Sequence, residues 1–268
     1  GQAVIARAIG AARLSEADHA LGQAVTLALI WGTIVGAALW VLVLPLVEIT
    51  NLKAEAANYC IGYVRVLAVS MPMAAVMLAG SMCLHGAGET TKPSLIAVSV
   101  NMCNILVSWV LCGADLRFGE TVITNPFPFD WHVLGIAAGT AIAYTLGAVI
   151  TLFIMIRGVK DLSLHANRMR PDRTMSRRII RVGVPNFFEG ISMWAVNLFV
   201  LMFIGIIASA EGDIGGLQGA HVIAVQWEAF SFLPGFAIGT AAGALAGQFL
   251  GAGNARMARK AVLVCTGI

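Results

Sequence analysis

Long apolar stretches alternate with short polar connections along almost the whole chain. Each stretch provides the roughly 20 apolar residues that a helix needs to cross a hydrocarbon core of about 30 Å, where no backbone group can remain unpaired. The pattern predicts an all-α polytopic membrane protein with six spans, over residues 21–47, 59–84, 93–114, 131–156, 182–210 and 216–250. Shorter apolar segments at residues 1–10 and 261–268 are predicted to be parts of two further helices.

Lys and Arg residues gather on alternate connections, and cytoplasmic loops are the ones that collect these residues. Fourteen of the 17 lie on one face: Arg7, Arg13, Lys92, Arg157, Lys160, Arg168, Arg170, Arg173, Arg177, Arg178, Arg181, Arg256, Arg259 and Lys260. This face is predicted to be cytoplasmic. The basic connection at residues 158–181 is interpreted as a topological signal that also attracts anionic lipid.

Composition narrows the functional class. Hydrophobic residues make up 59% of the chain and charged residues 12%, and the net charge of +3 is too small to indicate a nucleic-acid partner. The five cysteines contain no CxxC pair, and no acidic cluster has metal-ligand spacing. No hydrolase or metalloprotease motif is present. We therefore expect neither an enzyme nor a bound cofactor.

One sequence outline occurs twice. Aligning Gly10 with Gly251 also aligns Ala3 with Ala244, and six spans separate the two copies. An even number of spans places both copies at the same membrane face, as in transporters whose halves are related by an axis along the membrane normal. The predicted domains are residues 1–157 (first lobe), 158–181 (basic linker) and 182–268 (start of a second lobe). The first residue is Gly, and we expect the chain to be part of a longer protein.

Two carboxylates lie within apolar stretches. Glu189 and Glu228 are candidates for an ion or substrate route, because an ionisable group at membrane depth is costly and usually faces a cavity or a partner. Gln226 lies near Glu228 and can extend its network. The alternative is that both carboxylates are interfacial or simply hydrogen-bonded.

Three further polar residues lie within spans. Arg65 is the only cation inside an apolar stretch, and it either extends toward the interface or pairs with a buried carboxylate. Asn101 and Asn104 share a helix face and either join helices or contact a ligand. We include all three as candidates for the transport route.

Small residues and prolines mark expected packing and bending positions. Pro72, Pro185 and Pro234 each remove a backbone donor within a span, which predicts either a fixed bend or a hinge. A row of glycines at every fourth position of the last span predicts close packing of another helix, at Gly239, Gly243, Gly247 and Gly251.

Several motifs, taken in order, resemble the multidrug and toxic compound extrusion (MATE) family: "GQAVIARAIGAARLSEADHA", "GSMCLHGAGETTKPS", "LGIAAGTAIAYTLG", "RVGVPNFFEG" and "FLPGFAIGTAAGALAGQFLGAGNARMARKA". The resemblance covers essentially the whole chain, as helix two to the start of helix nine. It implies two six-helix lobes and export of organic, often cationic, compounds in exchange for H⁺ or Na⁺. Several members carry a functional Glu eight residues after the helix-seven Pro, where this chain has Met193, whereas Glu189 is four residues after Pro185.

The leading hypothesis is a monomeric, cation-coupled antiporter of the bacterial inner membrane, whose expected partners are the lipid bilayer and small organic cations. A flippase for lipid-linked oligosaccharides or lipid precursors is the alternative, although the visible spans offer only Arg65 to hold a pyrophosphate. A membrane scaffold is the third possibility, and it predicts no cavity between the halves.

Overall fold

The computed structural model describes residues 1–49, 54–119, 121–127, 129–210 and 216–267. Its six long helices are α2 (Leu14–Ile49), α3 (Ala54–Gly86), α4 (Thr91–Cys112), α5 (His132–Arg157), α6 (Arg173–Ala210) and α7 (Gly216–Gly251). All six are long and apolar enough to cross a membrane, so the six predicted spans are confirmed. Shorter helices at the two ends are α1 (Gln2–Gly10) and α8 (Ala255–Thr266).

The helix boundaries differ from the apolar stretches at two places. Helix α4 ends at Cys112 because Gly113 adopts the left-handed conformation, with φ of 74°. Helix α6 begins at Arg173, so residues 173–181 of the predicted linker are helical and continuous with the following span. The rest of the linker contains a short 3₁₀ helix, η1 (Ala166–Met169).

The connection between α4 and α5 contains a small hairpin that the apolar pattern did not predict. Strand β1 (Leu116–Phe118) pairs with β2 (Thr121–Ile123) in antiparallel register, with Leu116 opposite Ile123. Two strands of three residues leave the fold all-α in class.

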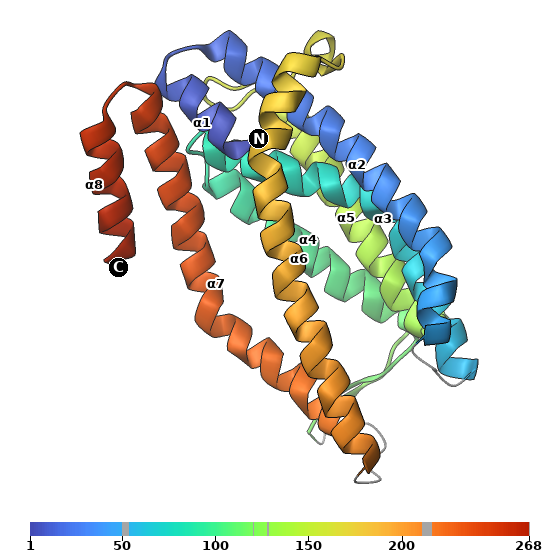
Figure 1. Ribbon diagram of the computed structural model, residues 1–268. Coiled ribbons are helices and arrows are strands. Elements are labelled where there is room, and N and C mark those ends of the chain that lie inside the picture. The colour runs from blue at the N-terminus through green and yellow to red at the C-terminus, as the bar shows by residue number, and fades with distance from the viewer. Residues whose placement is uncertain (50–53, 120, 128, 211–215, 268) are drawn as a thin grey trace.

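Helices α1 to α5 form one packed group, in which α3 contacts both α2 and α5, and α4 lies against α5. Small residues allow this close packing: a Cβ at Gly80 would overlap the Thr151 side chain, and one at Gly147 would overlap Met77. Helices α6 and α7 are far more exposed. Figure 1 shows them meeting at its lower edge and diverging upward, where α7 approaches α1.

The two copies of the repeated motif pack against each other where α1 meets α7. A Cβ at Gly10 would overlap the carbonyl of Gln248, and a Cβ at Gly251 would overlap the carbonyl of Arg7. The repeat offset of 241 residues relates Arg7 to Gln248 as it relates Gly10 to Gly251. The contact is therefore reciprocal, as expected for elements related by a pseudo-twofold axis.

Two glutamine side chains add polar contacts to this crossing. Gln2 Nε2 at the start of α1 donates to the carbonyl oxygen of Thr240 on α7, at 2.9 Å. Gln248 Nε2 on α7 donates to the carbonyl oxygen of Gly86, the last residue of α3, at 3.1 Å. Helix α7 is thus hydrogen-bonded to the beginning of α1 and to the end of α3.

The basic linker is docked on α2 by a fully buried side chain. Gln23 Nε2 donates to the carbonyl oxygens of Arg168 (2.9 Å) and Arg170 (2.6 Å). Its Oε1 accepts from the backbone N–H of Asp172 (2.9 Å) and from Ser176 Oγ (3.1 Å). One amide group therefore satisfies four partners in the linker and in the first turn of α6.

An ionisable pair supports the same junction. His19 Nε2 on α2 donates to Asp172 Oδ2 at 2.9 Å, and the N–H groups of Thr174 and Met175 also donate to this carboxylate. The His19 hydrogen bond, followed by the Thr174 N–H, lowers the pKa of Asp172. A carboxyl group whose pKa is lowered on folding stabilises the folded state above its ordinary pKa, and this contribution disappears as the pH falls through the lowered value. The junction is therefore favoured at neutral pH.

The reciprocal crossing generates a prediction for two glycines of the same helix. Gly251→Ala places a methyl group against the carbonyl of Arg7 and is expected to destabilise the protein by about 1–3 kcal/mol. Gly243→Ala meets no atom within 4 Å and is expected to be neutral, or stabilising by up to about 1 kcal/mol through helix propensity. Thermal unfolding of each variant in detergent measures the difference. Equal melting temperatures would contradict the crossing.

The docked linker generates a second prediction. Gln23→Leu leaves backbone groups of the linker unpaired and is expected to cost about 2–3 kcal/mol. Trypsin should then cleave after Arg168 and Arg173 at least several-fold faster, as followed by mass spectrometry of the fragments. Thr33→Val is the control, since Thr33 bonds only to Leu29 within its own helix. Unchanged cleavage in Gln23→Leu would show that the linker is held by other contacts.

Candidate functional site

Helix α6 contacts the packed group of helices α1 to α5, here called the first helix group, through aromatic rings. Trp31 on α2 packs edge-on against Phe187, with ring centroids 5.8 Å apart and an interplanar angle of 86°. Phe187 also packs against Phe188 at 5.8 Å. An open apolar groove of about 500 Å³ continues from Phe187 along α6, lined by Asn186, Phe187, Gly190, Ile191, Trp194, Ala195 and Leu198.

The groove has the composition of a surface for bulky apolar or cationic molecules. Its members recur at helical spacing, so they share one face of α6. Trp194 is 76% exposed, and an indole ring attracts organic cations over its face. Asn186 is the one polar side chain among the residues that line the groove.

The two candidate carboxylates lie apart from each other. Glu189 is about 31 Å along α6 from its end at Ala210, and Glu228 is about 18 Å along α7 from its start at Gly216, at 1.5 Å per residue. Both side chains are exposed, and neither forms an ion pair or hydrogen bond within the described part of the chain. At 3.6 residues per turn, Glu189 points away from the groove face. Gln226, also exposed, is two positions from Glu228 and on a different face.

Arg65 contacts an aromatic ring. Its guanidinium carbon lies 5.3 Å from the ring centroid of Trp40 on α2. Its Nε is buried and has no hydrogen-bond partner among the described residues. No carboxylate of the described ranges pairs with it, so the cation–π contact is the interaction that positions this side chain.

The two asparagines have different surroundings. Asn104 Oδ1 accepts from Ser108 Oγ on its own helix at 2.9 Å and from Thr140 Oγ1 on α5 at 3.3 Å, so it joins α4 to α5. Asn101 is exposed. The structure therefore brings only Asn104 of this pair into a contact between helices.

The prolines and glycines singled out in the sequence lie inside long helices. Pro72, Pro185 and Pro234 are interior to α3, α6 and α7 respectively. Figure 1 shows α7 bent partway along its length, and Pro234 is close to the midpoint of its bounds. Within the glycine row of α7, the two members that contact α1 are Gly247 and Gly251, whereas a Cβ at Gly239 or Gly243 would meet no atom within 4 Å.

Sequence reasoning missed the residues that hold the helices together at the basic end, which is the end that carries Arg7, Arg13 and Arg178. Gln23 lies at the start of the apolar stretch 21–47 and His19 just before it, and Glu16 and Arg178 belong to segments interpreted as cytoplasmic connections. The available signal was a glutamine next to an otherwise apolar run, since a buried amide requires hydrogen-bond partners. The identity of those partners depends on the fold.

Comparison with known proteins finds that the chain is similar to one family of transporters. The MatE family model matches residues 1–110. Over 257 residues the chain is 30% identical to "Probable multidrug resistance protein NorM" of Thermotoga maritima, which covers 93% of this chain and 50% of that protein. The chain is therefore similar to the MATE family along almost its whole length.

A further relative and two solved structures show the same similarity. Multidrug resistance protein PmpM of Pseudomonas aeruginosa is 25% identical over 237 residues, which are 88% of this chain and 47% of PmpM. A crystal structure of MATE in the bent conformation superposes with a TM-score of 0.78 at 21% identity, over 99% of this chain and 55% of that one. An outward-facing MATE transporter of the MOP superfamily matches with a TM-score of 0.69, also at 21% identity, over 99% of this chain and 55% of that one. The chain spans about half the length of the relatives it matches.

The two asparagines of α4 provide a matched test of packing against ligand binding. Asn104→Ala removes the bond between α4 and α5 and is expected to lower stability by about 1 kcal/mol. Asn101→Ala changes an exposed side chain and is expected to have no measurable effect. Thermal unfolding of both variants measures these two effects. A stability loss confined to Asn101→Ala would contradict the packing role given to Asn104.

Proposed function

We propose that the protein is a secondary active antiporter that exports organic, often cationic, compounds in exchange for H⁺ or Na⁺. The observation that carries this proposal is the reciprocal packing of Gly10 on Gln248 and Gly251 on Arg7, because it relates the two repeats as two lobes meeting at one end. The multidrug resistance names of the NorM and PmpM relatives support the same function.

The mechanism follows from where the lobes touch. Helices α1 and α7 pack at the end that carries Arg7 and Arg13, which the charge distribution predicts to be cytoplasmic. We propose that this contact closes the cytoplasmic side and that transport requires the glycine crossing to separate. At Gly10 and Gly251 backbone lies on backbone, so no bulky side chains interdigitate at these two points, which suits repeated opening.

The substrate class is proposed from the exposed aromatic surface of the second lobe. Trp194 on α6 and Trp227 and Phe230 on α7 are each at least 70% exposed, and Trp227 packs against Phe230 at 5.9 Å. Aromatic faces attract organic cations, and flat apolar rings bind many shapes. The flippase alternative requires several cations to hold a pyrophosphate within the transport route, whereas Arg65 is the one cation inside the six apolar stretches.

Glu189 and Glu228 are the proposed carriers of the coupling ion. Both are carboxylates on the helices of the second lobe, and both lack a compensating cation among the described residues. A carboxylate without a fixed cation is available to bind H⁺ or Na⁺ as the lobes move. The proposed setting is the bacterial inner membrane, in keeping with the bacterial relatives.

Transport by the reconstituted protein tests this proposal. Efflux of a fluorescent organic cation from proteoliposomes is measured under an imposed H⁺ gradient and then an imposed Na⁺ gradient. Glu189→Gln or Glu228→Gln is expected to reduce gradient-driven efflux at least tenfold, because a neutral amide cannot exchange the coupling ion. Glu48→Gln, at the end of α2, is the matched control and should leave efflux unchanged. Failure of the folded protein to transport under either gradient would overturn the antiporter assignment.

A further inference from the structure

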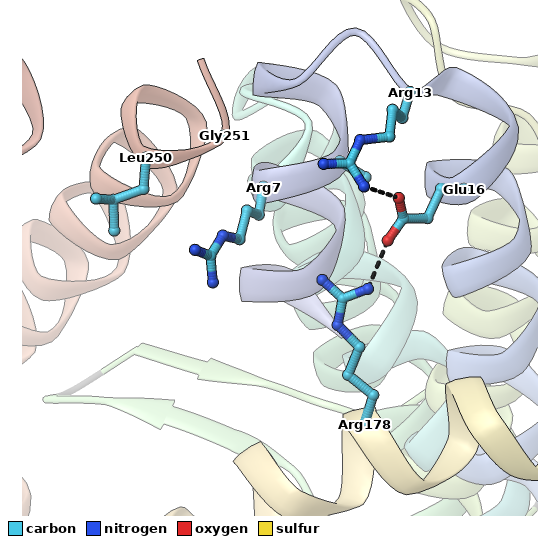
Figure 2. A pocket seen from close by; sticks show the side chains of 7 residues that line it. Arg7, Arg13, Glu16, Arg178, Leu250 and Gly251 are labelled. Atoms are coloured by element: carbon cyan, nitrogen blue, oxygen red, sulfur yellow. Dashed lines mark hydrogen bonds and ion pairs between the residues drawn. The ribbon is translucent and has the colours of Figure 1, made fainter. Parts of the chain in front are cut away.

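A charged pocket of about 230 Å³ lies where α1, α2, α6 and α7 converge at the basic end. Figure 2 shows Arg13, just before α2, and Arg178 from α6 bonded to Glu16 in the first turn of α2, while Arg7 from α1 extends toward the side of Leu250. The lining is completed by Ala8, Leu250 and Gly251. The pocket is separate from the groove of α6 and contains neither candidate carboxylate.

The pocket has more positive charge than its carboxylate balances. Glu16 Oε2 accepts from Arg13 at 3.0 Å, and its Oε1 accepts from Arg178 at 2.5 Å. Each of these bonds uses one of the five N–H groups of a guanidinium, and the Arg7 side chain forms no hydrogen bond or ion pair with any described residue. Three guanidinium groups and one carboxylate give a formal charge of +2, which pH does not remove because arginine stays protonated.

Helix ends account for part of this charge. Helices α1 and α7 end at Gly10 and Gly251, so their C-terminal carbonyls lie beside the pocket. Each helix C-terminus is equivalent to about −0.5 elementary charge, so the two together offset about one unit. A positive surplus of about one unit therefore remains, together with the unused donors of three guanidinium groups.

We propose that this pocket binds a phosphate group through Arg7, Arg13 and Arg178. Planar guanidinium groups match phosphate oxygens with two parallel hydrogen bonds, and three of them converge here from different elements. Leu250 provides an apolar wall at the same pocket. The phosphate belongs either to a phospholipid headgroup, which is available at a membrane face, or to a soluble phosphate compound.

The position of the pocket gives the bound phosphate a mechanical consequence. Arg7 and Arg13 belong to the first helix group, whereas Arg178 and Gly251 belong to α6 and α7. One phosphate bound by all three arginines therefore bridges the first group to the helices that follow the linker. It stabilises the arrangement in which α1 and α7 are packed together.

Thermal unfolding under three conditions tests the proposal and distinguishes a lipid headgroup from a soluble phosphate compound. The purified protein is placed in phosphatidylcholine nanodiscs, in nanodiscs that also contain phosphatidylglycerol, or in phosphatidylcholine nanodiscs with inorganic phosphate, against chloride at equal ionic strength. Phosphatidylglycerol or inorganic phosphate is expected to raise the melting temperature by a few degrees. A response to the lipid alone assigns a headgroup, and a response to inorganic phosphate assigns a soluble compound.

Arg7→Gln is expected to abolish most of this shift, since Arg7 has no structural partner to lose. Arg256→Gln, on α8 and outside the pocket, is the charge-matched control and should retain the shift. Binding to the unsubstituted protein is also measured directly, by equilibrium dialysis of labelled phosphate and ³¹P NMR of a short-chain phosphatidylglycerol. Absence of saturable binding of both, or an equal shift in Arg7→Gln, would overturn the proposal.

Discussion

The close backbone approach of α1 and α7 is the constraint on which the arrangement of the two helix groups depends. In a bilayer, apolar side chains gain little by leaving lipid for a neighbouring helix, so association depends on packing and hydrogen bonding. Gly10 and Gly251 allow backbone to lie on backbone, and each faces a residue of the other repeat. The hydrogen bonds of Gln2 and Gln248 then define the axial position of α7.

The linker adds a second constraint of a different kind. It is held through its backbone by the buried amide of Gln23, and the Arg168 side chain adds a hydrogen bond to Ser15 Oγ at 3.0 Å. A hydrogen bond in a low-dielectric interior is strong, and an unpaired group there is costly, so one glutamine is sufficient to position the segment. Arg178 bonds to Glu16, and the side chains of Arg170, Arg173, Arg177 and Arg181 form no hydrogen bond with any residue that the structure describes, so they are available to water or lipid headgroups. The beginning of α6 is therefore attached to α2 before the helix enters the membrane.

The chemical groups of interest divide between two regions. The exposed aromatic rings and carboxylates belong to α6 and α7, whereas the arginine pocket lies at the basic end, where these helices meet the first group. Under the two proposals, one region interacts with a transported molecule and the other binds phosphate. The two proposals share the crossing of α1 and α7, but neither candidate carboxylate lines the pocket, so the transport and phosphate-binding experiments can give different outcomes.

The apolar runs were sufficient to predict six spans and the all-α class, because the thickness of the bilayer sets a minimum length that each run exceeds. The repeat was likewise visible in the pattern of Gly10 and Gly251. The residues that join the elements were not visible in this way. Gln23, Glu16 and Arg178 have partners far away in the chain, and no local pattern encodes those pairings.

The interiors of the helices likewise combine features that the sequence predicted with contacts that only the tertiary structure decided. The spacing of the glycines in α7 predicted close packing along the whole row, but only the arrangement of α1 determined that Gly247 and Gly251 are contacted while Gly239 and Gly243 are not. Likewise, Asn101 and Asn104 are equivalent as sequence, and the position of Thr140 on α5 distinguishes them. Local propensity and the bilayer determine which residues form helices. The partners of each helix face depend on where the other helices lie, because packing and hydrogen bonding are interactions between elements distant in sequence.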